Sequence, residues 1–199
     1  GAISRAGAEG RMELRVIRNQ AEMAAVAAWC GDRASADTMW GHVQGMSELS
    51  DLRAMSAAWR DEGTGRVLSL AVTVPGRTNY AWCTIPAPDG GWDLARREAV
   101  VAEIANRGEK PAEVMLWAVG RWGWDAVGDH AMLAPGESRR FACRLRETFP
   151  DGTPKVDPAQ IKQVRVMVLK ALNGATLEVR GLAAAGEAPP WRRPTARLD

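Results

Sequence analysis

The segment from residue 92 to residue 124 constrains the fold of this chain more than any other. It contains two apolar runs, Ala99–Ala105 and Val114–Val119, which are separated by the turn formers Asn106-Arg107-Gly108 and Pro111. Apolar runs of this length, bounded by Gly, Pro and Asn, are typical of strands in the core of a β-sandwich. The segment therefore predicts two buried strands, and it ends in a loop rich in tryptophan.

Most of the chain after residue 65 continues the β pattern. Apolar or alternating runs predict strands at Val67–Val74, Asn79–Ile85, Arg139–Leu145, Gln160–Lys170 and Ala175–Leu182. Pro75-Gly76 predicts a turn that pairs the first two of these strands as a hairpin, and Asn173-Gly174 predicts a second hairpin. Seven or eight strands joined by Pro/Gly turns, with little helix after residue 60, predict an all-β fold that forms a single β-sandwich.

The first 65 residues are less regular. Met12–Ile17 alternates like a strand, and Asn19 followed by Glu22 predicts the start of a short helix from Ala21 to about Trp29. Leu52–Trp59 fits a helical turn or a strand equally well. The expected organisation is one β-sandwich domain at residues 1–186, with an irregular part at 1–65 and regular strands at 66–185, and a Pro- and Arg-rich tail at 187–199.

The charge balance argues against some classes of partner. The chain has 26 Lys and Arg against 24 Asp and Glu, with a formal net charge of +2. Its only basic cluster is Arg192-Arg193 with Arg197 in the tail, so we expect no nucleic-acid partner. No apolar segment approaches the length of a membrane span. The chain begins Gly-Ala-Ile-Ser without a leader pattern, which suggests a processed mature protein or a fragment.

No catalytic motif is recognisable. The two histidines, His42 and His130, are expected on the solvated surface, and Asp129 next to His130 points to the opposite face if both lie on a strand. The turn Gly63-Thr64-Gly65 has neither the spacing nor the following helix of a phosphate-binding loop. We therefore expect a non-enzyme, and an enzyme with an unfamiliar carboxylate site is the weakest alternative.

The three cysteines Cys30, Cys83 and Cys143 are far apart and lack the spacing of metal ligands, so we expect no zinc site. They are consistent with one disulfide and one free thiol, or with three buried thiols. The cysteine content therefore does not indicate whether the protein is located in an oxidising or a reducing compartment of the cell.

Four short motifs follow one another between about residues 65 and 185: Trp92-Asp93-Leu94, Asn106–Pro111, Leu133–Glu137 and Asp157-Pro158. With the strands between them, they resemble the galactose-binding-like jelly-roll modules that accompany secreted polysaccharide-degrading enzymes, agarase-type glycosidases among them. The resemblance implies a β-sandwich jelly roll and a secreted, non-catalytic carbohydrate-binding module. Such a module would work attached to or beside a glycosidase domain.

Modules of this family often hold a structural calcium ion through an acidic residue on the last strand. Here Arg180 stands where an acid would be expected, and a calcium ion needs several oxygen ligands. We therefore expect no cofactor, although Glu13 or Glu178 could contribute to a calcium site.

Tryptophan is the unusual residue of this chain, with nine Trp against one Tyr and two Phe. Trp122 and Trp124 are the predicted ligand-binding residues, with Asp125 and Arg121 as polar partners. If the preceding strand continues, both rings face the same side and could stack on the C–H faces of a sugar. The alternative is that the two rings close one end of the sandwich.

Other aromatic residues leave further alternatives open. Tyr80, a further predicted ligand contact, shares a strand face with Trp82 that belongs to the core or to a concave groove, and Trp82 and Trp117 are expected mainly in the core. Trp191 lies in a stiff Pro-rich segment and could dock on this domain, a neighbouring domain or another chain. The competing function is therefore a structural or assembly protein, whose exposed Trp and C-terminal tail make protein–protein contacts.

Overall fold

The computed structural model describes residues 39–40, 50–62, 65–73, 80–171 and 174–192. The chain divides into two compact units, residues 1–32 and 33–199, and all described residues lie in the second. The predicted strand Met12–Ile17, the predicted helix Ala21–Trp29 and the residues Cys30 and His42 lie outside the described residues. The predicted domain boundaries stay a prediction.

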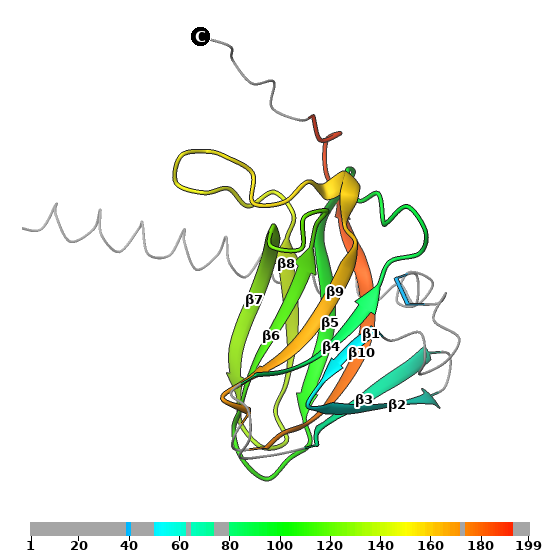
Figure 1. The fold of residues 1–199 in the computed structure, drawn as a ribbon, viewed down its shortest axis with the longest axis vertical. Coiled ribbons are helices and arrows are strands. Elements are labelled where there is room, and N and C mark those ends of the chain that lie inside the picture. Colours follow the sequence, from blue (N-terminus) through cyan, green and yellow to red (C-terminus); the bar gives the residue numbers. More distant parts are fainter. Residues whose placement is uncertain (1–38, 41–49, 63–64, 74–79, 172–173, 193–199) are drawn as a thin grey trace, which may run out of the picture. The chain divides into compact units, whose positions relative to one another are not determined.

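The described residues form ten strands in two antiparallel sheets (Figure 1). The strands are β1 (Ser50–Arg53), β2 (Met55–Glu62), β3 (Gly65–Val72), β4 (Tyr80–Pro86), β5 (Arg97–Asn106), β6 (Ala112–Val119), β7 (Ala126–Leu133), β8 (Ser138–Arg144), β9 (Gln163–Leu169) and β10 (Thr176–Glu187). A short 3-10 helix, η2 (Pro158–Gln160), precedes β9. Sheet A has the strand order β1-β4-β9-β6-β7, and sheet B has the order β2-β3-β10-β5-β8.

The strand pairing is that of a jelly roll. β6 pairs with β7, β5 with β8, β4 with β9 and β3 with β10, so each pair encloses the one before it. Successive pairs fall in opposite sheets, as in a long hairpin rolled into a sandwich of two Greek keys. The predicted fold class, a β-sandwich jelly roll, is confirmed. Leu52–Trp59, which sequence left undecided, is strand on both sides of Ala54, and this residue (φ 53°) lies where the chain passes from sheet A to sheet B.

Two predicted hairpins are wrong. β3 and β4 lie in different sheets, and so do β9 and β10. A Pro-Gly or Asn-Gly turn signal in a sequence does not determine whether the next strand pairs with its predecessor or crosses to the other sheet. In this topology each of these strands pairs with a partner that is distant in sequence.

The core lies between the two sheets and follows from the alternation of side chains along each strand. On β6, Val114, Leu116 and Ala118 are buried, while Trp117 is only half-buried on the outer face. Trp82 lies half-buried on the same outer face of sheet A, so the prediction that both tryptophans belong to the core is wrong. The reason is that their smaller neighbours on each strand already occupy the core side.

The four sequence motifs form two contacts between distant turns. Trp92 is buried and pairs with Ile161, and the Leu94 amide donates to the Pro158 carbonyl (2.8 Å), which joins the first motif to the last. Asn106 joins the other two motifs. Its amide Nδ2 donates to the carbonyls of Lys110 (2.8 Å) and Leu133 (3.0 Å).

Candidate functional site

The tryptophan-rich segment is a loop and not a strand continuation. β6 ends at Val119 and β7 begins at Ala126, so residues 120–125, which we call the Trp loop, connect these two strands at one end of sheet A. The Gly120 amide donates to the Asp125 carbonyl (2.8 Å), and the Trp122 amide donates to Oδ1 of Asp125 (2.8 Å). Both hydrogen bonds close the Trp loop on itself, and Asp125 therefore fixes its conformation.

The two predicted indoles are exposed on this loop. Trp122 is 58% exposed and Trp124 is 80% exposed, so the alternative that the rings close the end of the sandwich is wrong. The Arg121 guanidinium lies over the Trp122 ring, with 4.8 Å between its Cζ and the ring centroid. A cation at this distance stabilises the ring position. The Trp loop therefore presents two large aromatic surfaces from a fixed backbone.

The structure brings together four of the five predicted site residues and separates the fifth. Arg121, Trp122, Trp124 and Asp125 share the Trp loop. Tyr80 lies across β9 from Glu113, at the opposite end of β6. Glu113 and Val119 are six residue-to-residue steps apart on β6, which corresponds to about 20 Å. Tyr80 therefore cannot contribute to the same small site.

The structure exposes a further aromatic residue that was not predicted from the sequence as part of a site. Phe149 is 49% exposed and lies in the connection between β8 and η2. The only sequence signal was an aromatic residue inside a loop rich in Pro, Gly and Asp, a pattern that predicts a turn and says nothing about exposure of the ring.

The outer face of sheet A carries two further tryptophans, Trp82 and Trp117. Trp82 lies under the guanidinium of Arg165, whose Cζ is 5.0 Å from the ring centroid, and Arg165 Nε donates to Thr84 (3.2 Å). Trp117 packs on Gly128, where a Cβ atom would lie 2.3 Å from the indole. Tyr80 and Trp82 therefore both lie on the outer face of sheet A.

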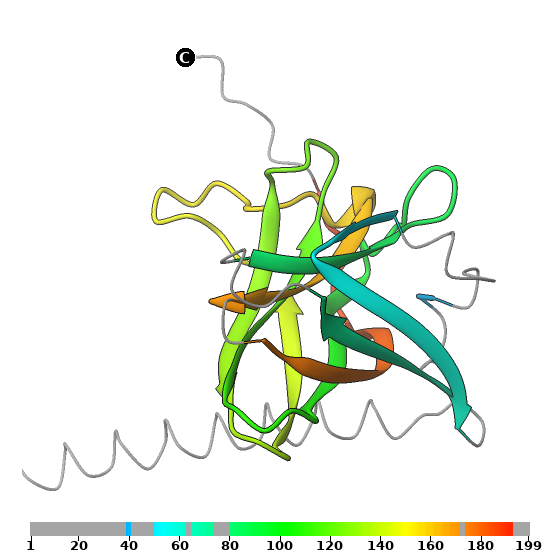
Figure 2. The same ribbon diagram turned by 60° about the horizontal axis from the view of Figure 1, so that its bottom comes forward.

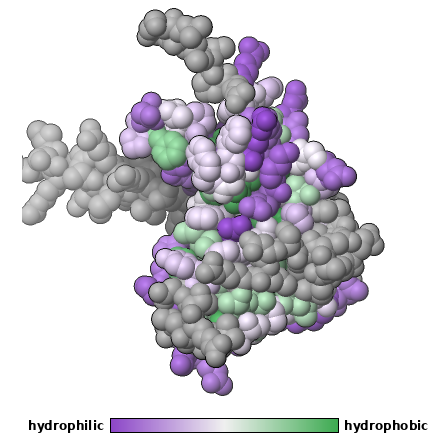
Figure 3. Space-filling model, viewed as in Figure 1, coloured by the Kyte–Doolittle hydropathy of each residue, from purple (hydrophilic) through white to green (hydrophobic). Residues whose placement is uncertain are grey.

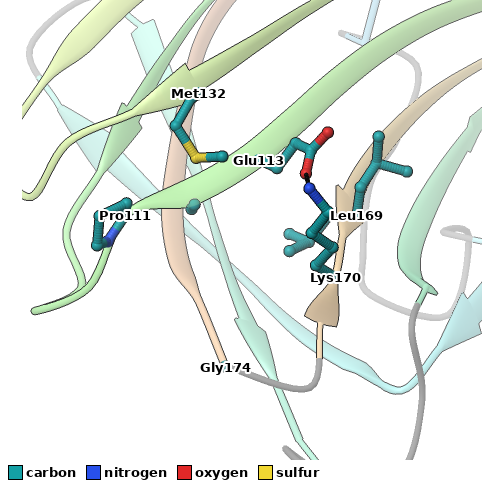
Figure 4. A pocket seen from close by; sticks show the side chains of 8 residues that line it. Pro111, Glu113, Met132, Leu169, Lys170 and Gly174 are labelled. Carbon is teal, nitrogen blue, oxygen red and sulfur yellow. Dashed lines mark ion pairs between the residues drawn. The ribbon is translucent and has the colours of Figure 1, made fainter.

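A shallow hollow lies at the end of sheet A away from the Trp loop (Figure 4). Glu113 in this hollow pairs with Lys170 (2.8 Å) and with Nε2 of His130 (2.9 Å). The hydrogen bonds from Lys170 and then from His130 lower the pKa of Glu113, so this carboxylate is ionised and held in place. The hollow is lined by Pro111, Ala112, Glu113, Met132, Val168, Leu169, Lys170 and Gly174.

Asp129, the chain neighbour of His130, contacts the other sheet. Its Oδ2 accepts a hydrogen bond from the Ala142 amide of β8 (3.0 Å), while His130 contacts β6. The two side chains point in opposite directions, as predicted for neighbours on a strand, and they do not form a catalytic pair.

The carboxylate of Glu178, a candidate calcium ligand, is bound by three arginine side chains. Its two carboxylate oxygens accept hydrogen bonds from Arg60 (2.8 Å), Arg107 (2.9 Å) and Arg180 (2.9 Å). Three guanidinium groups neutralise the carboxylate and fill its acceptor positions, so Glu178 does not fit a calcium site. Glu13, the other candidate, lies outside the described residues.

Removing the charge of Glu178 should weaken the fold. The pKa of this carboxyl is lowered to about 2, mainly by the hydrogen bond from Arg60 and then by those from Arg107 and Arg180, while burial opposes the shift. The carboxylate is 12% exposed but Arg60 and Arg107 are about half-exposed, so solvent screening limits its contribution to about 1–2 kcal/mol. We expect Glu178→Gln to lower the free energy of unfolding by that amount at pH 7.

The pH dependence of the free energy of unfolding shows whether the loss in Glu178→Gln comes from the missing charge. A carboxyl with a lowered pKa in the folded state stabilises the fold above its unfolded-state pKa, and this contribution is lost as the pH falls through the folded pKa. The difference between wild type and Glu178→Gln in urea denaturation should therefore shrink between about pH 4.5 and pH 2. The exposed Glu109→Gln is the control, and an equal effect of both substitutions would contradict the prediction.

Cys83 and Cys143 are both buried free thiols. Burial raises the pKa of each thiol to about 12, so neither is a nucleophile near neutral pH. Because both thiols are free in the structure, Cys83 and Cys143 do not form a disulfide with each other.

The C-terminal segment docks on this domain. The Trp191 amide donates to the Ala95 carbonyl (3.0 Å), and Arg146 Nη2 donates to the carbonyls of Ala95 (2.6 Å) and Pro189 (2.8 Å). The Trp191 side chain is half-buried. Of the docking partners considered for Trp191, the structure shows its own domain. No helix in the described part of the chain is long and apolar enough to cross a membrane.

Comparison with known proteins shows similarity in structure only. No family model and no curated protein matches this chain. Its structure is similar to that of an exo-β-agarase, with a TM-score of 0.57 and 13% identity over 76% of this chain and 25% of that chain. It is similar to the agarase AgWH50C, with a TM-score of 0.54 and 16% identity over 73% of this chain and 23% of that chain.

The chain thus spans about a quarter of the length of each agarase structure. The family 11 carbohydrate-binding module of the cellulase Lic26A-Cel5E of Clostridium thermocellum gives a TM-score of 0.47 and 14% identity over 74% of this chain and 93% of that chain. The resemblance to the jelly-roll modules of agarase-type glycosidases is confirmed at the level of the fold: this chain contains a jelly-roll β-sandwich similar to part of each agarase structure.

Proposed function

We propose that this protein is a non-catalytic carbohydrate-binding module that holds a polysaccharide on the Trp loop. The observation that carries the proposal is the exposure of Trp122 and Trp124 on a loop that Asp125 holds in one conformation. An exposed indole presents apolar surface to water, which is costly unless a ligand covers it. The C–H faces of a sugar ring supply that cover, and the indole N–H can donate to a hydroxyl.

Two further observations support a polysaccharide as the ligand. The two agarases are among the similar structures, and this chain corresponds to only part of each. Arg121 beside the rings offers guanidinium donors for sugar hydroxyls. In this proposal Asp125 acts through the backbone of the loop, Tyr80 lies outside the site, and binding needs no metal or cofactor. A location outside the cell, where such a ligand would be met, is part of the proposal.

The competing proposal is a structural protein that assembles through its tail. The contact of Trp191 with Ala95 places the described part of the tail on its own domain, so this segment is already engaged. The exposed Trp loop remains as the surface that needs a ligand, and carbohydrate binding accounts for it better.

Substituting the exposed rings tests the proposal. We expect Trp124→Ala to weaken binding to soluble agarose about 10-fold or more, because one stacked ring contributes about 1.4 kcal/mol or more. Trp122→Ala should have an effect of similar direction. Affinity electrophoresis and isothermal titration with agarose, and a glycan array for other polysaccharides, provide the measurement.

The matched control is Met132→Ala, which removes another exposed apolar side chain at the opposite end of sheet A. Its binding should equal that of the wild type. If wild type and Trp124→Ala bind every polysaccharide equally, or neither binds any, the Trp loop is not a carbohydrate site.

A further inference from the structure

We infer that Phe149 is a further ligand-contacting residue and that the ligand is an extended chain crossing two loops, a refinement that rests on the proposed function. The second loop comprises residues 147–155, between β8 and η2, and we call it the Phe loop.

The Phe loop leads into a segment that contacts the base of the Trp loop. Val156, which follows the Phe loop, is buried, and its Cγ2 would lie 2.8 Å from a Cβ atom placed on Gly120. Farther along, the Lys162 amide donates to the carbonyl of Val119 (2.9 Å), immediately before the Trp loop. In Figures 1 and 2 both loops lie at the same end of the sandwich.

The Phe loop is held in one conformation by its own hydrogen bonds. The Phe149 amide donates to the Thr153 carbonyl (2.8 Å), and the Gly152 amide donates to the Phe149 carbonyl (2.9 Å). At the base of the loop Lys155 pairs with Glu147, and Lys155 Nζ lies 5.8 Å from the centroid of the Phe149 ring. A ring held on an ordered loop loses little conformational entropy when it binds a ligand.

Most of the exposed aromatic rings lie at the end of the sandwich that carries the Trp loop and the Phe loop. Among the described residues the exposed large hydrophobic side chains are Tyr80, Trp122, Trp124, Met132 and Phe149. Three of these are aromatic residues of the Trp loop and the Phe loop, whereas Tyr80 and Met132 lie at the other end of sheet A. Figure 3 shows a hydrophobic patch surrounded by hydrophilic residues on the Phe loop.

Aromatic surfaces on two separate loops favour a ligand that is longer than a single sugar. In this proposal a short oligosaccharide covers the rings of the Trp loop, and a longer chain contacts the Trp loop and Phe149 together. The second contact then forms within the complex already made at the first, so affinity rises with chain length. This predicts binding along the polysaccharide chain and not only at its end.

The test measures how the effect of each substitution on affinity depends on the length of the ligand. Dissociation constants are measured by isothermal titration for agarose-derived disaccharide, tetrasaccharide and octasaccharide with wild type, Phe149→Ala, Phe149→Tyr and Trp124→Ala. We expect Phe149→Ala to weaken octasaccharide binding about 5- to 10-fold and to leave disaccharide binding unchanged. Phe149→Tyr should restore binding, and Trp124→Ala should weaken binding of every length.

The outcomes separate the two proposals. If Trp124→Ala weakens binding and Phe149→Ala matches wild type at every length, the contribution of Phe149 is refuted and the carbohydrate site stands. If Phe149→Ala weakens all lengths equally, the ring does not mark a second contact, and the extended chain is refuted. If wild type binds no length, or Trp124→Ala has no effect, the proposed function fails and the inference fails with it.

Discussion

Replacing Asn106 with aspartate should lower the free energy of unfolding by about 3 kcal/mol, although the two side chains have nearly the same shape. Asn106 is fully buried. Its Nδ2 donates to the carbonyls of Lys110 and Leu133, and its Oδ1 accepts from the Gly108 amide (2.9 Å). Aspartate would replace the two-donor group by an oxygen facing two carbonyl oxygens, which leaves both carbonyls unsatisfied in a buried site.

The backbone of Asn106 makes the same position a junction. Its amide donates to the Glu137 carbonyl (2.8 Å), and its carbonyl accepts from the Gly136 amide (2.9 Å). The turn after β5 and the turn after β7 are therefore held together through one residue. We expect the loss of its side-chain donors to loosen both turns.

Thermal and urea denaturation measure the effect, and a loss of this size corresponds to a melting temperature about 6–12 °C lower. Asp157→Asn is the reverse exchange in another of the four motifs. There the side chain only accepts a hydrogen bond from the Ala159 amide (2.9 Å), which asparagine can also do, so its effect should stay below about 0.5 kcal/mol. Equal effects of the two exchanges would contradict this account of Asn106.

Acid should partly rescue the Asn106→Asp variant. Protonating the introduced carboxyl removes its charge and supplies one O–H donor for one of the two carbonyls. The stability difference from wild type should therefore narrow as the pH falls from 7 to 4. A difference that is independent of pH would show that the loss comes from packing and not from the missing donors.

The strands of this fold could be predicted from the sequence, but their partners could not. Alternation and turn residues are local properties, and they located most of the strands from β3 onward. The assignment of β3 and β4 to different sheets depends on β10 and β9, which lie about 100 residues later. Local turn signals carry no information about such pairing, and this is why the predicted hairpins failed.

The candidate site also combines features that local sequence patterns indicate with features that depend on distant parts of the chain. The sequence indicated Trp122 and Trp124 because two indoles lie beside Arg121 and Asp125, but it left open whether the rings are exposed or close the end of the sandwich. The structure places both on the surface. Their relation to Tyr80 depends on strand register across β9, which no local pattern contains. Phe149 was missed because its neighbours form a turn, and turn chemistry alone does not reveal whether an aromatic side chain packs inward.

Replacing Gly120 with alanine should weaken both the fold and ligand binding. A Cβ atom at this position would lie 2.2 Å from Oδ2 of Asp125 and 2.8 Å from Cγ2 of Val156. Both distances are far below van der Waals contact, and buried Val156 has little room to move. We expect a loss of about 2 kcal/mol in the free energy of unfolding, and about 10-fold weaker agarose binding, because a displaced Asp125 no longer holds the Trp122 amide.

Gly65→Ala is the matched control, because a Cβ atom there meets no heavy atom within 4 Å and the backbone conformation suits any residue. Urea denaturation and titration with agarose should show no loss for this variant. If Gly120→Ala behaves like Gly65→Ala, the contacts at the base of the Trp loop do not organise it.

A double variant separates stability from binding. Asp125→Ala in the Gly120→Ala background removes the closest clash, so part of the lost stability should return. The carboxylate that accepts the Trp122 amide is then absent, and the Trp loop has lost the contact that fixes its conformation. Agarose binding should therefore stay weak while the melting temperature rises. Recovery of both together would mean that the loop binds its ligand without the conformation that Asp125 imposes.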